Sequence, residues 1–174
     1  MEAETLEKLK YPIGKFIWNK FDESERKGFI KTIESFPNKI KSMVENLTDE
    51  QLEKPYRPNG WTVRQVVHHC ADSHMNAFIR FKLALTEEKP TVKAYEEQLW
   101  AKQADYKLPV GISLNLIESL HARWAALLNS MKPDDFYAKY IHPQSGKELD
   151  LNYMLALYNW HCKHHLGHIE STLV

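Results

Sequence analysis

Seven of the nine histidines in this 174-residue chain fall in two short clusters, VVHHCADSH at 66–74 and WHCKHHLGH at 160–168. Neutral imidazole offers a nitrogen lone pair without the cost of removing a proton, which makes histidine the commonest metal-binding side chain near neutral pH. Two histidines four residues apart on a helix lie about 40° apart around its axis and about 6 Å apart along it. Both can therefore reach one ion, and the clusters predict a metal site.

The second cluster contains two pairs with this spacing, His161 with His165 and His164 with His168. At about 100° per residue, His161 and His165 border the apolar stripe of their helix. His164 and His168 lie further round, away from that stripe. The pattern therefore favours His161 and His165 as the pair that faces inward.

The first cluster does not point to one ligand as clearly. A helical wheel places His74 near the centre of the apolar face, His69 on its flank and His68 almost opposite. Periodicity alone favours His74 as the inward residue. A lone histidine on an apolar face is, however, more often a core residue held by a hydrogen bond than a metal ligand. Spacing alone leaves the third ligand open.

Four long helices are expected to hold these clusters. Hydrophobic periodicity places them near residues 24–47, 62–86, 111–131 and 151–172. Four amphipathic helices of similar length most simply form a four-helix bundle, and bundles often build metal sites from side chains on facing helices. The sequence therefore predicts an all-α four-helix bundle.

Capping and helix-breaking residues define the ends of these helices. Thr62 and Gln65 have capping-box spacing at the start of the second helix. Pro90 and Pro133 are expected to end the second and third helices. Pro37 lies inside the first helix and is expected to kink or split it.

Smaller elements complete the predicted architecture. Residues 11–22 are expected to form an extended arm and residues 94–106 a shorter helix. Aromatic and β-branched residues flank a Pro/Ser/Gly turn at 143–146, which predicts a small β-hairpin within 136–151. No repeat or flexible linker divides the sequence, so residues 1–174 are expected to form one domain.

The composition narrows the class of protein. Hydrophobic residues make up 43% of the chain, enough for a packed core, and Lys plus Arg equals Asp plus Glu at 23 each. Without a basic surplus, nucleic-acid binding is not expected. The charged N-terminus is unlike a secretory signal, and no run approaches the roughly 18 apolar residues of a spanning helix. We therefore expect a cytoplasmic protein without membrane contact, with Cys70 and Cys162 as free buried thiols.

Several motifs together resemble the YfiT-like branch of the DinB superfamily: GWTVRQVVHHCADSH, ESLHARWAALL, YIHP and LYNWHCKHHLGHI. The resemblance runs from Tyr11 to about Thr172. It implies a four-helix bundle and a metal-dependent hydrolase whose metal is held by three histidines. One of these stands eight residues after the tryptophan of the GW motif, and two form H-x-x-x-H in the last helix. Carried onto this sequence, they are His69, His161 and His165, with His69 in place of His74.

Such a shell implies one divalent metal per chain with at least one open coordination position. Zn²⁺ suits three imidazoles, and Ni²⁺ also fits. An open position allows two chemistries, because a metal lowers the pKa of bound water toward about 7 and also binds a thiol as thiolate. We therefore expect a hydrolase, with transfer of a low-molecular-weight thiol, as in bacillithiol S-transferases of the superfamily, as the alternative. A bundle whose metal only joins two helices is a further alternative.

Three further residues are candidates for acid–base chemistry or for supporting the ligands: Asp72, His74 and His142. An aspartate or histidine of this kind more often has a structural role than a catalytic one. The expected partner is a small-molecule substrate, and the resemblance also implies a homodimer.

Overall fold

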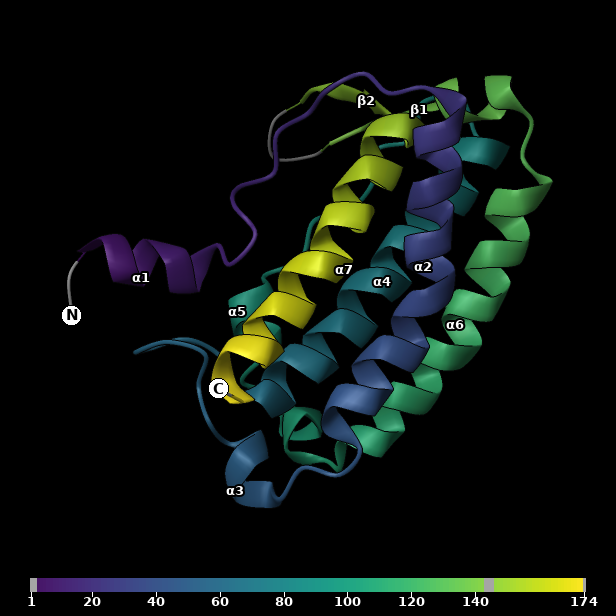
Figure 1. Ribbon diagram of the computed structural model, residues 1–174. Helices are drawn as coiled ribbons and strands as arrows, with labels where there is room; N and C mark the ends of the chain where they lie inside the picture. The colour runs from purple at the N-terminus through teal and green to yellow at the C-terminus, as the bar shows by residue number, and fades with distance from the viewer. Residues whose placement is uncertain (1–2, 143–145, 174) are drawn as a thin grey trace.

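The computed structural model describes residues 3–142 and 146–173, and four long helices make up most of it (Figure 1). They are α2 (Glu23–Val44), α4 (Val63–Thr86), α6 (Val110–Ser130) and α7 (Leu151–Leu173). These bounds lie within a few residues of the four predicted ranges, so the predicted all-α four-helix bundle is confirmed. Helices α2 and α4 lie diagonally across the bundle, because each packs mainly against α6 and α7.

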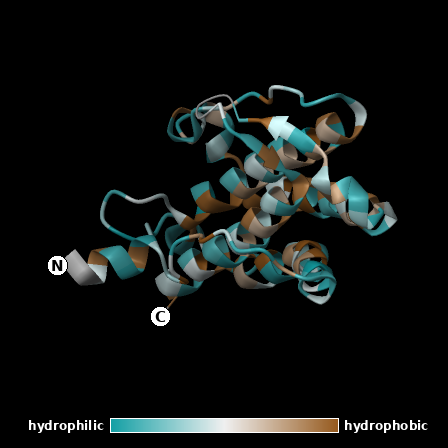
Figure 2. Ribbon diagram, turned by 90° about the horizontal axis from the view of Figure 1, so that it is seen from above, coloured by the Kyte–Doolittle hydropathy of each residue, from teal (hydrophilic) through white to brown (hydrophobic). Residues whose placement is uncertain are grey.

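The core lies between these four helices. Figure 2 shows hydrophobic residues gathered on the helix faces that are turned toward the middle of the bundle. Ile33 and Phe36 of α2, Phe81 of α4, Trp124 of α6 and Leu155 of α7 are completely buried there. Cys70 and Cys162 are free and buried in the same core, as expected. No helix within residues 3–142 and 146–173 has the length and apolar character needed to span a bilayer.

The predicted capping box at the start of α4 is present. The Thr62 hydroxyl accepts a hydrogen bond of 3.2 Å from the Gln65 N–H, and the Gln65 side-chain oxygen accepts one of 3.0 Å from the Thr62 N–H. These bonds satisfy two donors that a helix end otherwise leaves without partners. The cap fixes where α4 begins and therefore where its histidines stand.

Thr62→Ala is expected to lower the free energy of unfolding by about 1 kcal/mol, because it removes the acceptor of this cap. Urea denaturation followed by circular dichroism would measure the change. Thr48→Ala is the matched control, since Thr48 forms the same capping box with Gln51 on the four-residue helix α3 (Asp49–Leu52). We expect a smaller loss in Thr48→Ala, because α3 has only four residues and α4 has 24, and an equal loss in both variants would contradict this expectation.

Pro37 was expected to kink or split the first long helix, and it does not split it. Helix α2 continues through it from Glu23 to Val44. Proline has no N–H, so the Ile33 carbonyl loses the donor that residue 37 would normally supply. The ring Nδ1 of His121 on α6 lies 2.7 Å from that carbonyl oxygen and takes the place of the missing donor.

The predicted helix over 94–106 is wrong. The structure has instead a one-turn helix α5 (Glu97–Trp100) and a 3₁₀ helix η1 (Ala104–Lys107). Leu99 and Trp100 are exposed, so this segment has no continuous apolar face that would hold a longer helix against the bundle.

The remaining elements lie outside the four long helices. Strands β1 (Lys139–Ile141) and β2 (Glu148–Asp150) pair antiparallel with Lys139 opposite Asp150, which confirms the predicted hairpin. Pro143 and Ser145 of its predicted turn lie outside the described residues. A short 3₁₀ helix η2 (Pro133–Tyr137) precedes the hairpin. Helix α1 (Ala3–Lys10) was not predicted. It is followed by the predicted arm, which has no regular secondary structure.

Candidate metal centre

Helices α4 and α7 bring His69, His161 and His165 together. One ring nitrogen of each residue lies within 4.8 Å of those of the other two. The Nε2 atoms of His69 and His161 are 3.2 Å apart. Two nitrogens bound to one tetrahedral zinc at about 2.0–2.1 Å would lie about 3.4 Å apart, so this spacing fits a shared ion. The structure thus assembles the three predicted residues, and their role as ligands stays a prediction.

Helix packing explains why the wheel favoured His74. Helix α4 packs against both α6 and α7, so its apolar face has two partners. His74 lies at the centre of that face, completely buried, with Nδ1 2.7 Å from Nε2 of His121 and Nε2 3.1 Å from Nδ1 of His161. His69 lies on the flank that faces α7. His74 is therefore a core histidine held by hydrogen bonds, the alternative that periodicity left open.

The three clustered histidines are neutral near pH 7. Burial, together with the nearby His168 and His164, lowers the pKa of His69 to about 3. Burial also lowers the pKa values of His161 and His165 well below the usual range. Neutral rings offer lone pairs at no cost in deprotonation, so this donor set fits a zinc-type or nickel-type ion. Nδ1 of His69 is buried and has no hydrogen-bond partner among the described residues.

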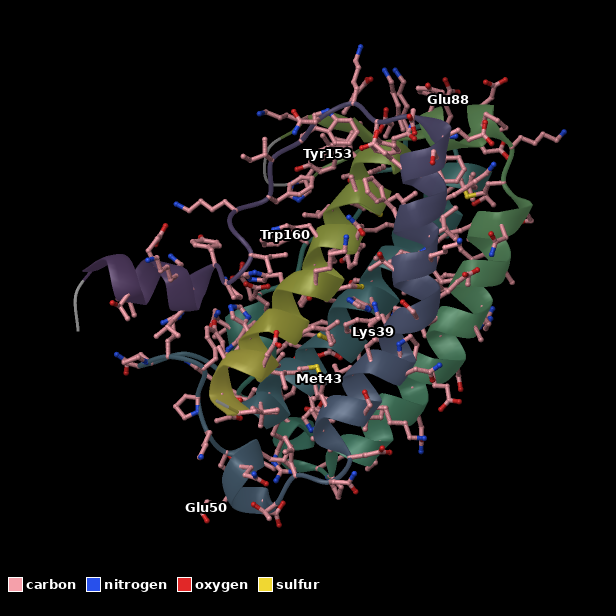
Figure 3. All side chains as sticks on the ribbon, in the orientation of Figure 1. Lys39, Met43, Glu50, Glu88, Tyr153 and Trp160 are labelled. Carbon is pink, nitrogen blue, oxygen red and sulfur yellow. The ribbon has the colours of Figure 1, made fainter. Side chains whose placement is uncertain are left out.

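A cavity of about 270 Å³ opens onto the three histidines. Its walls come from the N-terminal segment, the 54–61 loop, α5 and α7. Besides the three histidines, it is lined by Lys10, Tyr11, Tyr56, Arg57, Trp61, Glu97, Gln98, Trp160, His164 and His168. Trp160 stands on α7 beside the N-terminal segment (Figure 3), and its indole N–H donates to the Gly14 carbonyl at 3.0 Å. The site is therefore reached from this side of the bundle.

Sequence reasoning missed Glu97 as a residue of this pocket. It lies on a helix of only one turn, which is too short to give a periodic signal. Partial burial raises the pKa of Glu97, and the adjacent Glu96 raises it further. A carboxylate with a raised pKa in a pocket with metal-type residues is a candidate acid–base group.

Three histidines that the wheel placed away from the apolar faces are buried, which corrects those expectations. His164 stacks on Trp160 at a ring-centroid distance of 4.2 Å, and His168 stacks on Tyr56 at 3.8 Å. His68 bonds the Ser113 hydroxyl at 2.7 Å, beside η1. Segments outside the four helices cover these faces, and a wheel for one helix does not include them.

The other candidates lie apart from the histidine cavity. The Asp72 carboxylate accepts a hydrogen bond of 2.7 Å from the Tyr106 hydroxyl, and burial raises its pKa while this bond opposes the rise. His142 lies at the hairpin, in a different pocket with Trp18 and Lys147. Of the three candidates, the structure brings only His74 into contact with a predicted ligand.

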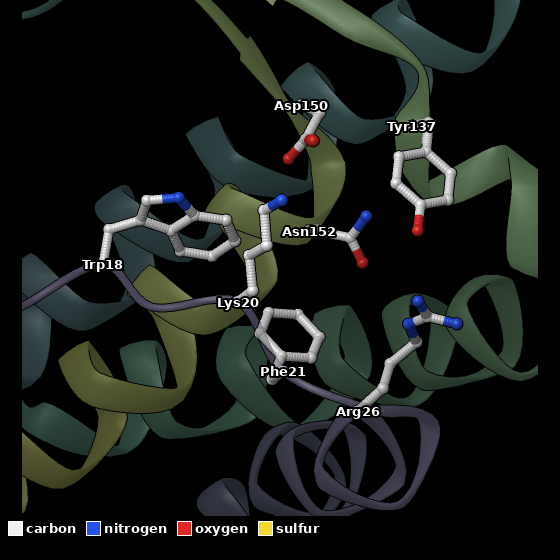
Figure 4. A pocket seen from close by; sticks show the side chains of 7 residues that line it. All are labelled: Trp18, Lys20, Phe21, Arg26, Tyr137, Asp150 and Asn152. Carbon is white, nitrogen blue, oxygen red and sulfur yellow. The ribbon is translucent and has the colours of Figure 1, made fainter.

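A separate cavity of about 190 Å³ lies near the hairpin (Figure 4). Its lining mixes aromatic, basic and amide groups from the arm, α2 and the start of α7. The residues are Trp18, Lys20, Phe21, Arg26, Tyr137, Asp150 and Asn152. None of them belongs to the histidine clusters, so this cavity is not part of the candidate centre.

The fold and the site together define a class of protein: a four-helix bundle in which two facing helices present three neutral histidines to one open cavity. Residues 32–169 match the DinB superfamily. The chain belongs to this superfamily, as the sequence motifs predicted.

Close relatives share nearly the whole chain. A Bacillus cereus protein named "putative metal-dependent hydrolase" is 49% identical over 164 residues, 94% of each chain. An Oceanobacillus iheyensis protein with the same description is 49% identical over 163 residues, 93% of this chain and 94% of its own. The solved structure of YfiT from Bacillus subtilis, described as "a probable metal-dependent hydrolase with an unusual four-helix bundle topology", superposes with a TM-score of 0.92. It is 44% identical and covers 95% of both chains.

Proposed function

We propose that this protein is a metal-dependent hydrolase in which His69, His161 and His165 bind one divalent metal, with zinc as the first candidate and nickel as the second. The observation that carries the proposal is the approach of three neutral ring nitrogens to within 4.8 Å of one another beside an open cavity. The names of the relatives support the same class of activity.

The metal, when bound, would supply Lewis acidity at a coordination position that the protein leaves free. The chain's own residues would exclude water from the cluster and accept the proton. The Trp61 ring lies 4.5 Å from the His69 ring, centroid to centroid, and shields that side of the cluster from water. Glu97 lines the cavity with a raised pKa and would accept the proton of the attacking nucleophile.

Two basic residues favour an anionic small-molecule substrate. Lys10 and Arg57 both line the cavity, from the end of α1 and from the 54–61 loop. A cavity with like charges on its wall attracts a ligand of opposite charge. This observation also suits the second candidate function, transfer of a low-molecular-weight thiol that carries carboxylates, because both reactions would use the same cluster and cavity.

Paired assays on zinc-loaded and metal-stripped protein would test the proposal. Hydrolysis of activated carboxylic and phosphate esters that requires zinc would support a hydrolase. Conjugation of a carboxylate-bearing thiol to an electrophile, without ester hydrolysis, would support thiol transfer instead. If neither substrate class is consumed by zinc-loaded protein, the proposal of an enzyme is wrong.

Glu97→Gln is expected to lower kcat by about 100-fold, because it removes the proposed proton acceptor while keeping the size of the side chain. Its zinc content should be unchanged, since Glu97 is not part of the histidine cluster. Glu88→Gln is the matched control, because Glu88 lies beyond the end of α4 and outside the cavity (Figure 3). Full activity in Glu97→Gln would exclude Glu97 as the base.

A further inference from the structure

Two buried histidines, His74 and His121, connect His161 to the backbone of α2. Nδ1 of His161 lies 3.1 Å from Nε2 of His74, and Nδ1 of His74 lies 2.7 Å from Nε2 of His121. Nδ1 of His121 lies 2.7 Å from the Ile33 carbonyl oxygen. We call this hydrogen-bonded series, from His161 through His74 and His121 to Ile33, the inner relay.

The backbone carbonyl at its end fixes every proton in the inner relay. A carbonyl oxygen can only accept, so Nδ1 of His121 carries a proton and donates it. In a neutral ring the other nitrogen is then a bare acceptor, so Nε2 of His121 accepts from Nδ1–H of His74. By the same step, Nε2 of His74 accepts from Nδ1–H of His161. This leaves Nε2 of His161 with its lone pair directed toward His69 and the cavity.

Pro37 makes the Ile33 oxygen available to this relay. Ile33 and Pro37 are both buried within α2, and Pro37 has no N–H with which to occupy the oxygen four residues earlier. Any other residue at position 37 would offer a backbone donor that competes with His121. Pro37 therefore leaves the Ile33 carbonyl oxygen available to accept the hydrogen bond from His121 at the end of the inner relay.

A second series connects His165 to the N-terminal segment. Nδ1 of His165 lies 3.3 Å from Nδ1 of His168, and Nε2 of His168 lies 3.2 Å from the Lys10 carbonyl oxygen. We call it the outer relay. The arm packs closely against α7 here: a Cβ added to Gly167 would lie only 3.0 Å from Cγ of Pro12. The same reasoning puts protons on Nε2 of His168 and on Nδ1 of His165, and leaves Nε2 of His165 bare.

We propose that these two relays position the metal-binding nitrogens: each uses a backbone carbonyl to hold a histidine of α7 in the tautomer with a bare Nε2. The inference rests on the proposed metal site. It assigns His74, His121 and His168 as positioning residues. A hydrogen bond to the ring nitrogen that does not bind the metal fixes the tautomer and the orientation of a metal-binding histidine. His69 differs from the other two, because its Nδ1 has no such partner among the described residues.

Nitrogen NMR of histidine tautomers tests the proposal directly. Two-bond ¹H–¹⁵N spectra of zinc-loaded and metal-stripped wild-type protein at pH 7.5 distinguish protonated Nδ1 from protonated Nε2. The expected result is protonation at Nδ1 for His74 and His121 and at Nε2 for His168. The Ser73 hydroxyl, 3.4 Å from Nε2 of His161, offers an alternative acceptor. Protonation of His74 at Nε2, or of His161 at Nε2 in the stripped protein, would overturn the inner relay.

Zinc affinity of relay variants gives a second test. His121→Phe is expected to weaken zinc binding at least about tenfold, although His121 touches none of the three proposed ligands. His121→Gln should restore affinity to within about threefold, because its amide oxygen can accept from His74. His168→Phe should weaken binding at least about tenfold through the outer relay.

His68→Phe is the matched control. It replaces another buried histidine with hydrogen bonds to a hydroxyl and a carbonyl, and its partners, Ser113 and Leu108, lie outside both relays. Equal affinities in His121→Phe and His68→Phe would contradict the inner relay while leaving the metal site in place. Absence of zinc binding in the wild type would instead contradict the proposed function itself.

Discussion

His161→Ala and His165→Ala are each expected to weaken zinc binding by at least about 100-fold. Structural zinc sites with four ligands bind with about 10–16 kcal/mol, or roughly 3 kcal/mol per ligand, which corresponds to about two powers of ten in the dissociation constant. Each of these variants also disconnects one relay, which should add to the loss. Competition with a chromophoric zinc chelator at constant pH would measure the dissociation constants.

His164→Ala is the control for these variants. His164 lies between the two residues on α7, lines the same cavity and is buried, but it belongs neither to the cluster of three nor to the relays. We expect its zinc dissociation constant to change less than about threefold. A loss in His164→Ala as large as in His165→Ala would show that the last-helix pair is misassigned.

Metal-free protein is expected to unfold in mild acid. Burial lowers the pKa of His69 and of His164 to about 3, and of His121 and His168 to about 4. The ordinary pKa is about 6.5, so the unfolded chain binds more protons below that pH and stability falls as the pH falls. Each such group contributes about 1.4 kcal/mol per pH unit, and four together remove about 5 kcal/mol per unit.

A domain with about 5–15 kcal/mol of stability would therefore reach its unfolding midpoint between about pH 4 and 5.5. Far-UV circular dichroism during an acid titration would measure it. Zinc binds only the neutral rings, so saturating zinc should move the midpoint to lower pH. A metal-free protein that stays folded at pH 3 would contradict the assignment of these histidines as buried and neutral.

The sequence predicted the four helices well, for physical reasons, and the assignment of His161 and His165 as the metal-binding pair stays a prediction. A period of 3.6 residues reports which face of a long helix is buried, and the cap at Thr62 marks where α4 begins. The same periodicity placed His161 and His165 at the edge of the apolar stripe of α7, and the structure brings their ring nitrogens close to that of His69. The third member of the cluster came only from the resemblance, because the face of α4 has two partners and a wheel does not distinguish the side facing α7 from the side facing α6.

The sequence did not predict which segments form the walls of the cavity. They come from the N-terminal segment, the 54–61 loop and the one-turn helix α5, which have no periodicity that would indicate what they cover. The burial of His68, His164 and His168 depends on these segments, and so does the position of Glu97. The homodimer implied by the resemblance stays a prediction that light scattering after size-exclusion chromatography would check.

The most direct test of the metal site is an anomalous difference map from crystals of zinc-loaded protein, with data collected on both sides of the zinc absorption edge. We predict one strong peak per chain, about 2.0–2.1 Å from Nε2 of His69, His161 and His165. A peak bound instead by His74 and His121 or by His164 and His168, or no peak at all in protein supplied with excess zinc, would contradict the three-histidine centre.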